Sequence, residues 1–532
     1  MLRTLGPRSG LRAPAVLWIP GLLAVALTLL PAWYLLERST EGGWSAWEET
    51  LSRSAVELLV NSLGLAAVVS ISAAAVAVPA AWLTVRCELP GRRLWAVALA
   101  LPLAIPSYVM GLTVVAALGP RGMLQDWLEP FGVDRLPEVY GFWGAAFTLS
   151  AVTFPYVFLV VSGAMRALDP SVEEASQSLG KTRWETFFRV TLPLLAPALA
   201  AGLLLVALYT LSDFGGVATL RYETFTRAIF IEYQTSFDRT AAAILGVALA
   251  CVAMVVLAAE LAVRARSVER LRARRIAPPA PIALGRWKWP ALAFLALVVA
   301  MTLAMPVFVL VYWLVKGIRA GTDFPDLWEP LRHTLLLGGG GALVTVALAL
   351  PLAVLSTRYG GAASRVLEQA TFVTHALPGL VVALSLVFFG IAYARDLYQT
   401  VWMLLLAYVI LFLPNALSAL RAPLLRQSRQ LEEAGAALGR GPLRVLASVT
   451  LPIARPGILV ALPLVFLTVV KELPATLLLS PPGYRTLPGV VWSLNSDATV
   501  GAAALPALIL VALAAVPVAT LAWWGGLGEG DA

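Results

Sequence analysis

The chain has 532 residues, of which 59% are hydrophobic and 13% are charged. Soluble domains carry roughly 25% charged residues, so this composition excludes an ordinary soluble domain and indicates a chain that crosses a membrane many times. Cys87 and Cys251 are its only cysteines, which excludes a disulfide framework and a cysteine-rich metal site.

Uncharged runs long enough to cross about 30 Å of hydrocarbon recur along the chain. We count twelve, and the clearest cover residues 58–85, 94–118, 141–165, 290–315 and 500–524. The first run follows several arginines, as a secretion signal would, but no small-residue cleavage site comes after it. We therefore expect it to be a retained span.

The net charge of +8 would suggest a nucleic-acid partner in a soluble protein, so the distribution of the charges decides its meaning. With the N-terminus inside and twelve alternating spans, one side carries 26 basic and 12 acidic residues, and the other carries 13 and 19. Basic residues gather on the cytoplasmic side of membrane proteins. We expect both termini in the cytoplasm, a lipid bilayer around the spans, and no nucleic-acid partner.

The two halves of the chain resemble each other. The run that begins at Asn61 matches the run that begins at His333, and the same offset of 272 pairs Arg86 with Arg358. Beyond the outer loop 119–140 the offset falls to 259, so the first half holds 13 more residues in that loop. Six spans separate the two copies, and an even number makes them parallel repeats.

The predicted fold class is an all-α polytopic membrane protein, with twelve transmembrane helices in two parallel six-helix repeats. We expect a first membrane domain over residues 1–263 and a second over 290–532. Residues 264–289 hold a run of arginines followed by prolines. We interpret this segment as a basic cytoplasmic linker near anionic headgroups.

A second match pairs EEASQSLGKTRWETFFRVTLP (173–193) with EEAGAALGRGPLRVLASVTLP (432–452). The first copy contains ASQSLGKT, which fits a loose phosphate-loop pattern. However, a run of membrane-span length precedes it instead of a short strand, and Asp169-Pro170 is a helix-start pair. The second copy has Arg440-Gly441 where Lys181-Thr182 stand in the first, so what repeats is not what a phosphate requires.

Each copy is predicted to form a helix, a turn and a second helix outside the bilayer, over residues 169–193 and 428–452. Gly180 and Gly439 suit the left-handed residue that ends a helix. Large apolar side chains then share a helical face: Trp184 and Phe187 in the first copy, Leu443 and Leu446 in the second. Such a loop, with an acidic pair at its start, suits insertion into a groove on another protein. The alternative is a structural loop that packs on its own spans.

These loops resemble the signature of the permease subunits of bacterial ATP-binding-cassette importers, which is Glu-Ala-Ala, three residues, Gly and a downstream Leu-Pro. Residues 174–180 and 433–439 match it, with Ser176 and Gly435 in place of the second Ala. The resemblance implies the type I importer membrane fold and residence in the bacterial inner membrane. It also implies that the loops dock on a cytoplasmic ATPase through these residues: Glu173, Glu174, Ala175, Gly180, Trp184, Phe187, Glu432, Glu433, Ala434, Gly439, Leu443 and Leu446.

The same resemblance implies partners and a division of labour. One fused chain is expected to pair with two copies of the ATPase and with a periplasmic substrate-binding protein. No cofactor is expected on this chain, because the ATPase would use the ATP. The stretch KELPATLLLSPPGYRTL (471–487) is similar to the ferric-iron branch of these permeases. Thiamine and polyamine permeases remain alternatives, and an ion-coupled secondary carrier is the rival from another class.

Charged residues within spans are costly and usually functional. Asp213 sits in the fifth span with apolar sequence on both sides, and the offset of 259 places Lys471 and Glu472 at the equivalent site. Two acids at equivalent sites of a parallel repeat are predicted to line a pathway and attract a cation; alternatively, both lie at the outer interface. His333 and His375 have no chelating neighbours in sequence, so no metal site is expected.

Overall fold

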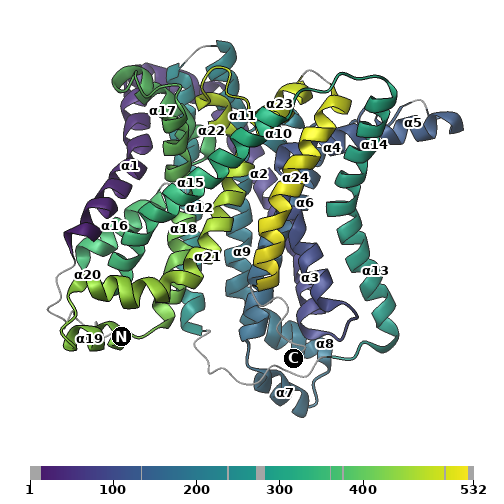
Figure 1. Cartoon of the computed structure of the whole chain (residues 1–532). Helices are drawn as coiled ribbons and strands as arrows, with labels where there is room; N and C mark the ends of the chain where they lie inside the picture. Colours follow the sequence, from purple (N-terminus) through teal and green to yellow (C-terminus); the bar gives the residue numbers. More distant parts are fainter. Residues whose placement is uncertain are drawn as a thin grey trace. The chain divides into compact units, whose positions relative to one another are not determined.

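The computed structural model describes residues 14–120, 122–133, 135–236, 239–270, 282–359, 361–373, 377–496 and 499–524 (Figure 1). His375, residues 271–281 of the basic linker, and both chain ends lie outside the described residues. Helices make up nearly all of the described chain, and one isolated bridge pairs Cys87 with Ile282. The all-α prediction is confirmed.

Ten helical stretches of the described chain are long and apolar enough to cross a membrane. Within lipid the backbone must satisfy its own hydrogen bonds, and an α-helix does so within a single apolar segment. They are formed by α1 (Ala15–Thr40), α2 (Gly43–Arg86), α6 (Phe142–Ala167), α9 (Leu192–Ser212), α12 (Arg239–Arg270), α13 with α14 (Lys288–Val299 and Met305–Arg319), α15 (Trp328–Arg358), α18 (Val401–Arg426), α21 (Leu451–Val470) and α24 (Val500–Trp524).

The count differs from the expected twelve because one expected span in each half is described as two shorter helices. In the first half, α3 (Arg92–Ala100) and α4 (Ser107–Leu118) belong to a pair bent by 94°, and counting it as one span gives eleven. The break falls at Pro106, which cannot continue a helix from the preceding residue. In the second half, α16 (Ala362–Val373) and α17 (Gly379–Tyr393) take the corresponding place, and each is too short to count alone.

The helices group into two compact units, which do not coincide with the two halves of the sequence. The first unit combines the N-terminal helix with residues 326–490. In it, α1 packs along α15, α16 and α17. The Tyr393 hydroxyl donates to Glu37 at 3.0 Å, and the Tyr34 ring lies 6.2 Å from Phe389.

The second unit combines residues 45–325 with 491–532. In it, α14 packs against α24 and α4, and the indole N–H of Trp313 donates to the Ala116 carbonyl at 3.0 Å. The outer loop of the first half forms α5 (Met123–Leu128), whose Asp126 pairs with Lys316 and accepts from Tyr312 at 3.2 Å. The first span of each half thus packs in the unit that holds most of the other half. The predicted domain boundaries at residues 263 and 290 describe the sequence repeat and stay a prediction.

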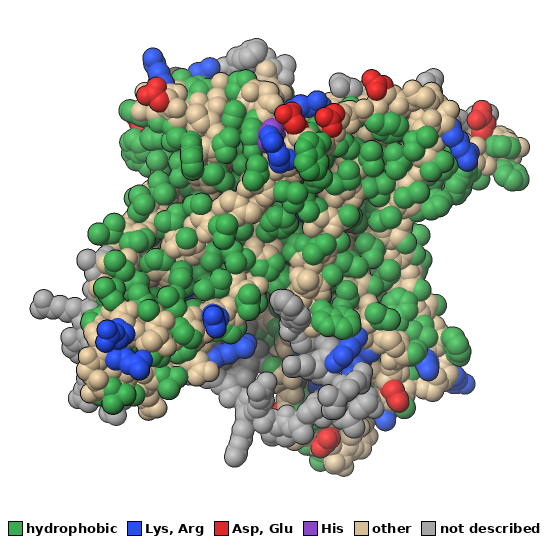
Figure 2. Space-filling view, viewed as in Figure 1, with side chains coloured by type: hydrophobic (Ala, Val, Ile, Leu, Met, Phe, Trp, Pro, Cys, Tyr) green, Lys and Arg blue, Asp and Glu red, His purple; other side chains and the backbone are tan. Residues whose placement is uncertain are grey.

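Side-chain types are distributed as a membrane requires. On the face shown in Figure 2, hydrophobic side chains cover the middle of the helices of each unit, and charged side chains gather toward the helix ends. The four glycines at 338–341 serve helix packing in part. A Cβ at Gly338 would lie 2.8 Å from Val470 and 2.9 Å from Phe466 of α21, whereas one at Gly339 would meet open space.

Candidate functional site

The first repeated loop (residues 169–193) begins with a capped helix, α7 (Pro170–Ser178). The Asp169 carboxylate accepts from the Ser171 N–H at 2.9 Å, and Pro170 occupies the first helical position. Residues 175–178, which a phosphate cradle would need in an open loop, are helical. The structure therefore agrees with the rejection of the phosphate-loop reading.

The turn after α7 is made by a left-handed glycine, as predicted. Gly180 has φ of +81° and donates to Gln177 at 2.9 Å, while Lys181 donates to Ser176 at 3.3 Å. These two bonds are the Schellman pattern that closes a helix C-terminus. Thr182 then starts α8 (Arg183–Thr186) with a capping box. The hydrogen bonds from Thr182 lower the pKa of Glu185, the partner in that box.

The second repeated loop (residues 428–452) follows the same path with different side chains. Helix α19 (Gln430–Ala437) ends at Gly439, whose φ is +78°, and Arg440 donates to Gly435 at 3.3 Å. Helix α20 (Pro442–Val445) starts on a proline, where the first loop uses the capping box. The shared requirement is the backbone turn.

Both loops rejoin their spans through a π-helical turn, which the sequence did not predict. These turns are η3 (Phe187–Thr191) before α9 and η8 (Leu446–Thr450) before α21, at matching positions. Such turns are rare and occur frequently at functional sites. They mark the joint between loop and span in both halves.

One face of each loop points into solvent. Leu179 and Leu438, which occupy matching positions at the tips, are 82% and 81% exposed. Large apolar side chains held this far out are typical of a surface that a partner covers. The predicted docking residues on this outward face are Glu174, Ala175, Gly180, Trp184, Glu433, Ala434, Gly439 and Leu443.

The first acid of each pair points inward instead. Glu173 accepts from Arg86, at the end of α2, at 3.1 Å, and from the Thr191 hydroxyl at 2.8 Å. In the other unit, Arg358 lies 2.7 Å from Glu432, which Thr450 also approaches at 3.4 Å. Sequence reasoning aligned the two arginines without giving them a role.

The apolar face after the turn is divided between the interior and solvent. Phe187 is half-buried, and its ring lies 6.1 Å from Trp82 of α2. Trp184 stacks on the Trp82 ring at 6.3 Å yet is 68% exposed. Leu446 in the second loop is half-buried like Phe187. The half-buried Phe187 and Leu446 therefore agree with the hypothesis of a structural loop that packs on its own spans. The exposed Trp184 agrees with the docking hypothesis.

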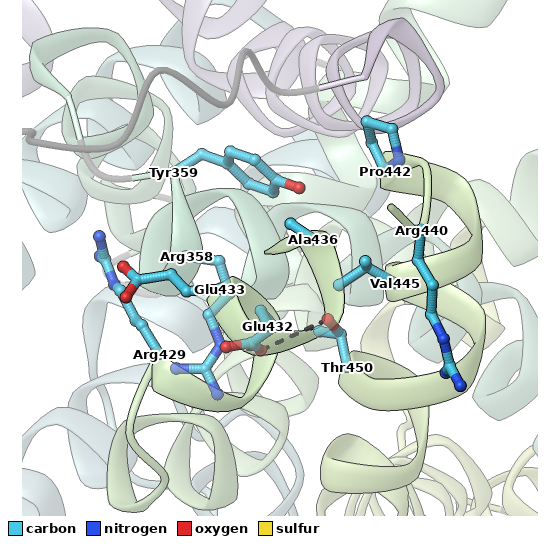
Figure 3. A pocket seen from close by; sticks show the side chains of 10 residues that line it. All are labelled: Arg358, Tyr359, Arg429, Glu432, Glu433, Ala436, Arg440, Pro442, Val445 and Thr450. Atoms are coloured by element: carbon cyan, nitrogen blue, oxygen red, sulfur yellow. Dashed lines mark hydrogen bonds and ion pairs between the residues drawn. The ribbon is translucent and has the colours of Figure 1, made fainter. Parts of the chain in front are cut away.

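A pocket lies between the second repeated loop and the end of α15 (Figure 3). Arg429 braces the start of α19 by donating to the Thr357 carbonyl at 2.7 Å, and Arg358 donates to Gln427 at 3.2 Å. Burial and the nearby Glu432 carboxylate raise the pKa of Tyr359. The lining residues are Arg358, Tyr359, Arg429, Glu432, Glu433, Ala436, Arg440, Pro442, Val445 and Thr450.

The two candidate pathway acids cap short helices beyond the spans. Asp213 is 8% exposed and accepts from the Gly216 N–H at 2.8 Å, at the start of α10 (Gly215–Thr219), and from the Ser107 side chain. Glu472 accepts from the N–H groups of Ala475 and Thr476 at 2.9 and 3.0 Å.

These contacts give both acids the same structural role. Glu472 starts α22 (Pro474–Leu479) as Asp213 starts α10, and a carboxylate at a helix N-terminus satisfies free N–H groups and the helix dipole. Lys471, also proposed for the pathway, is half-buried at the end of α21. Capping gives both acids a structural role, and contact with a substrate stays a prediction.

His333 is held by protein groups. Its Nδ1 lies 2.9 Å from the Arg485 carbonyl, and its ring stacks on Tyr484 at 3.8 Å. Within the described ranges, no three His, Cys, Asp or Glu side chains come together as metal ligands. Cys87 is buried and Cys251 is exposed.

A polytopic helical chain that carries the same outward-facing loop once in each half has the architecture of a duplicated transport permease. It belongs to the family of binding-protein-dependent transport system inner membrane components, whose model matches residues 66–267 and 346–523.

The chain is 36% identical to the Fe(3+)-transport system permease protein FbpB 2 of Haemophilus influenzae, over 92% of this chain and 94% of that protein. It is 32% identical to the sulfate transport system permease protein CysT of Escherichia coli, over 45% and 85%. It is also 31% identical to the molybdenum transport system permease protein ModB of Escherichia coli, over 33% and 80%.

Proposed function

We propose that the chain forms the translocation pathway of an importer for ferric iron, which a periplasmic binding protein delivers and ATP hydrolysis on separate subunits drives. Its similarity to the Haemophilus ferric permease covers both halves of both chains, which supports iron. The sulfate and molybdenum permeases match less than half of this chain, so they support the fold more than the substrate.

The repeated loops are proposed as the docking sites for two ATPase subunits in the cytoplasm. The observation that carries this proposal is the matching outward face, with Leu179 and Leu438 more than four-fifths exposed at the tips. A leucine kept in water twice, at the same position of a repeat, is explained by a partner that covers it. The charge distribution supports a cytoplasmic position for these loops and for both termini.

Docking would move the spans through the π-helical turns η3 and η8, which connect each loop to its span. Closure of an ATPase dimer pulls the two loops together, and helices that continue from the loops into α9 and α21 carry this pull into the membrane. A transporter whose two halves rock about a central site switches its access from one side to the other. The chain needs no nucleotide site of its own for this cycle.

Uptake assays test the substrate. A strain without this chain is expected to lose accumulation of radioactive ferric iron and to regain it when the wild-type chain is supplied. Thiamine, a polyamine and sulfate serve as parallel substrates in the same strain. Normal iron accumulation with a loss of thiamine or polyamine uptake would reject iron and select the alternative.

A further inference from the structure

An ion pair between a buried arginine and a half-buried glutamate ties each repeated loop to the rest of its unit and joins three elements. In the first loop, Glu173 of α7 meets Arg86 of α2 and Thr191 of the π turn before α9. The Arg86 side chain is 3% exposed and the Glu173 side chain 19%. The carboxylate therefore connects the loop helix to the ends of two spans.

The second loop repeats this arrangement with different neighbours. Glu432 of α19 meets Arg358 of α15 and Thr450 of the π turn before α21, and the two charged side chains are 12% and 7% exposed. The two arginines are 272 residues apart in sequence, whereas the two glutamates and the two threonines are each 259 residues apart. The 13-residue insertion of the first half therefore lies between its arginine and its glutamate. The same contact forms in both halves despite that difference in spacing.

A buried charge pair resists separation. In a medium of low dielectric constant, an arginine without its carboxylate is an uncompensated buried charge, and removing one partner is strongly destabilising. Movement of α7 alone would separate Glu173 from Arg86. The helix therefore moves together with α2 and α9.

We infer that Arg86–Glu173–Thr191 and Arg358–Glu432–Thr450 are rigid links that transmit the movement of a docked partner into two spans of each unit. This inference rests on the proposed docking of ATPase subunits at the outward face. Neither link belongs to that face, so these residues position the loop and do not bind the partner.

The acidic pair of each loop thereby acquires two different roles. Glu174 and Glu433 follow the linked acids directly in sequence, yet their side chains are exposed. Consecutive residues of a helix point about 100° apart, so one acid faces the spans while the next faces solvent. In each acidic pair, the first glutamate thus transmits movement to the spans and the second contributes to docking.

The experiment compares two matched double variants of the full chain, purified with its ATPase subunits in proteoliposomes. The link variant carries Glu173→Gln and Glu432→Gln, and the control carries Glu174→Gln and Glu433→Gln. We expect the link variant to retain its ATPase subunits and their ATP hydrolysis, while ferric iron imported per ATP falls by at least about tenfold. The control is expected to bind the subunits more weakly and to import a normal amount per ATP.

Equal import per ATP in the link variant and the wild type would overturn the inference. Failure of the wild-type chain to retain ATPase subunits would instead reject the proposed function, so the two failures are distinguishable. The variant with Thr191→Val and Thr450→Val removes two hydroxyls and no charge. It is expected to fold and to lose import per ATP in the same direction by a smaller factor; unchanged coupling would count against the links even if the glutamine variant were not recovered.

Discussion

The left-handed glycines of the two turns give the sharpest prediction about docking. Gly180 and Gly439 have φ of +81° and +78°, and a Cβ added at either would meet no atom within 4 Å. Replacement by alanine therefore creates no clash with the rest of the chain. Its whole effect comes from the backbone, because a residue with a Cβ pays roughly 1–2 kcal/mol in this conformation.

The size of the effect follows from that cost. A penalty of about 1–2 kcal/mol lowers the equilibrium constant for the observed turn by a factor of about 5–30. If the ATPase binds the turn as the structure shows it, its Kd for a loop with Gly180→Ala rises by up to the same factor. The two loops share no contact residues, so Gly180→Ala and Gly439→Ala are expected to add in free energy.

The assay measures the Kd of purified ATPase subunits for the detergent-solubilised chain, which is immobilised on a sensor surface. Asparagine tolerates the left-handed conformation, so Gly439→Asn is expected to bind more tightly than Gly439→Ala, and Gly439→Val most weakly. Gly441 is a matched control in the same loop, because its φ is −65° and it also faces open space. If Gly441→Ala and Gly439→Ala weaken binding equally, the reasoning about the turn is refuted.

Three further predictions concern a cap, a helix contact and a candidate pathway acid. Thr182→Ala is expected to destabilise the start of α8 by about 1 kcal/mol, seen as faster amide exchange there. Because the pKa of Glu185 is lowered in the folded loop, its contribution to the stability of the loop is present above its unfolded pKa and is lost as pH falls through the folded value. Protection factors of the α8 amides, which allow for the intrinsic pH dependence of exchange, are expected to fall on acidification, and constant protection factors would contradict this. Gly338→Val is expected to cost about 1–3 kcal/mol by overpacking against α21, whereas Gly339→Val is tolerated, and equal thermal stabilities would refute the contact. Asp213→Asn keeps an oxygen to cap α10 and is expected to transport more iron than Asp213→Ala; equal losses would favour a role for the charge itself.

The sequence predicted the spans because lipid imposes a strong and uniform rule. Composition and the lengths of apolar runs follow directly from the thickness of the hydrocarbon core. Which spans pack together is a different question, because all of them are equally apolar. The packing of α1 against α15 and of α14 against α24 depends on side-chain shape and left no signal in the repeat.

Within the loops, the local features were predictable and the tertiary ones were not. Gly180 and Gly439 were identified because the left-handed turn excludes most other residues. The link between Arg86, Glu173 and Thr191 joins three separate segments, and its threonine sits in a π turn that no local pattern indicated. One usable signal existed, namely an arginine that recurs at the same end of the same span.

The candidate pathway acids show the limit of reasoning from burial alone. Asp213 and Glu472 were correctly paired by the repeat, and the sequence left open whether they face a pathway or the outer interface. The structure adds the capping bonds to α10 and α22, which any acid followed by a short helix can make. That following helix is too short for hydrophobic periodicity to reveal.

Two separate ATPase subunits are proposed to bind this chain, one at each repeated loop. Native mass spectrometry of the purified complex tests this by counting ATPase subunits for each chain. We expect two subunits on the wild-type chain and one when Gly180, Leu179 and Glu174 of the first repeated loop are replaced by valine, serine and glutamine. An altered chain that kept two subunits, or a chain that hydrolysed ATP when freed of all partners, would contradict the proposal.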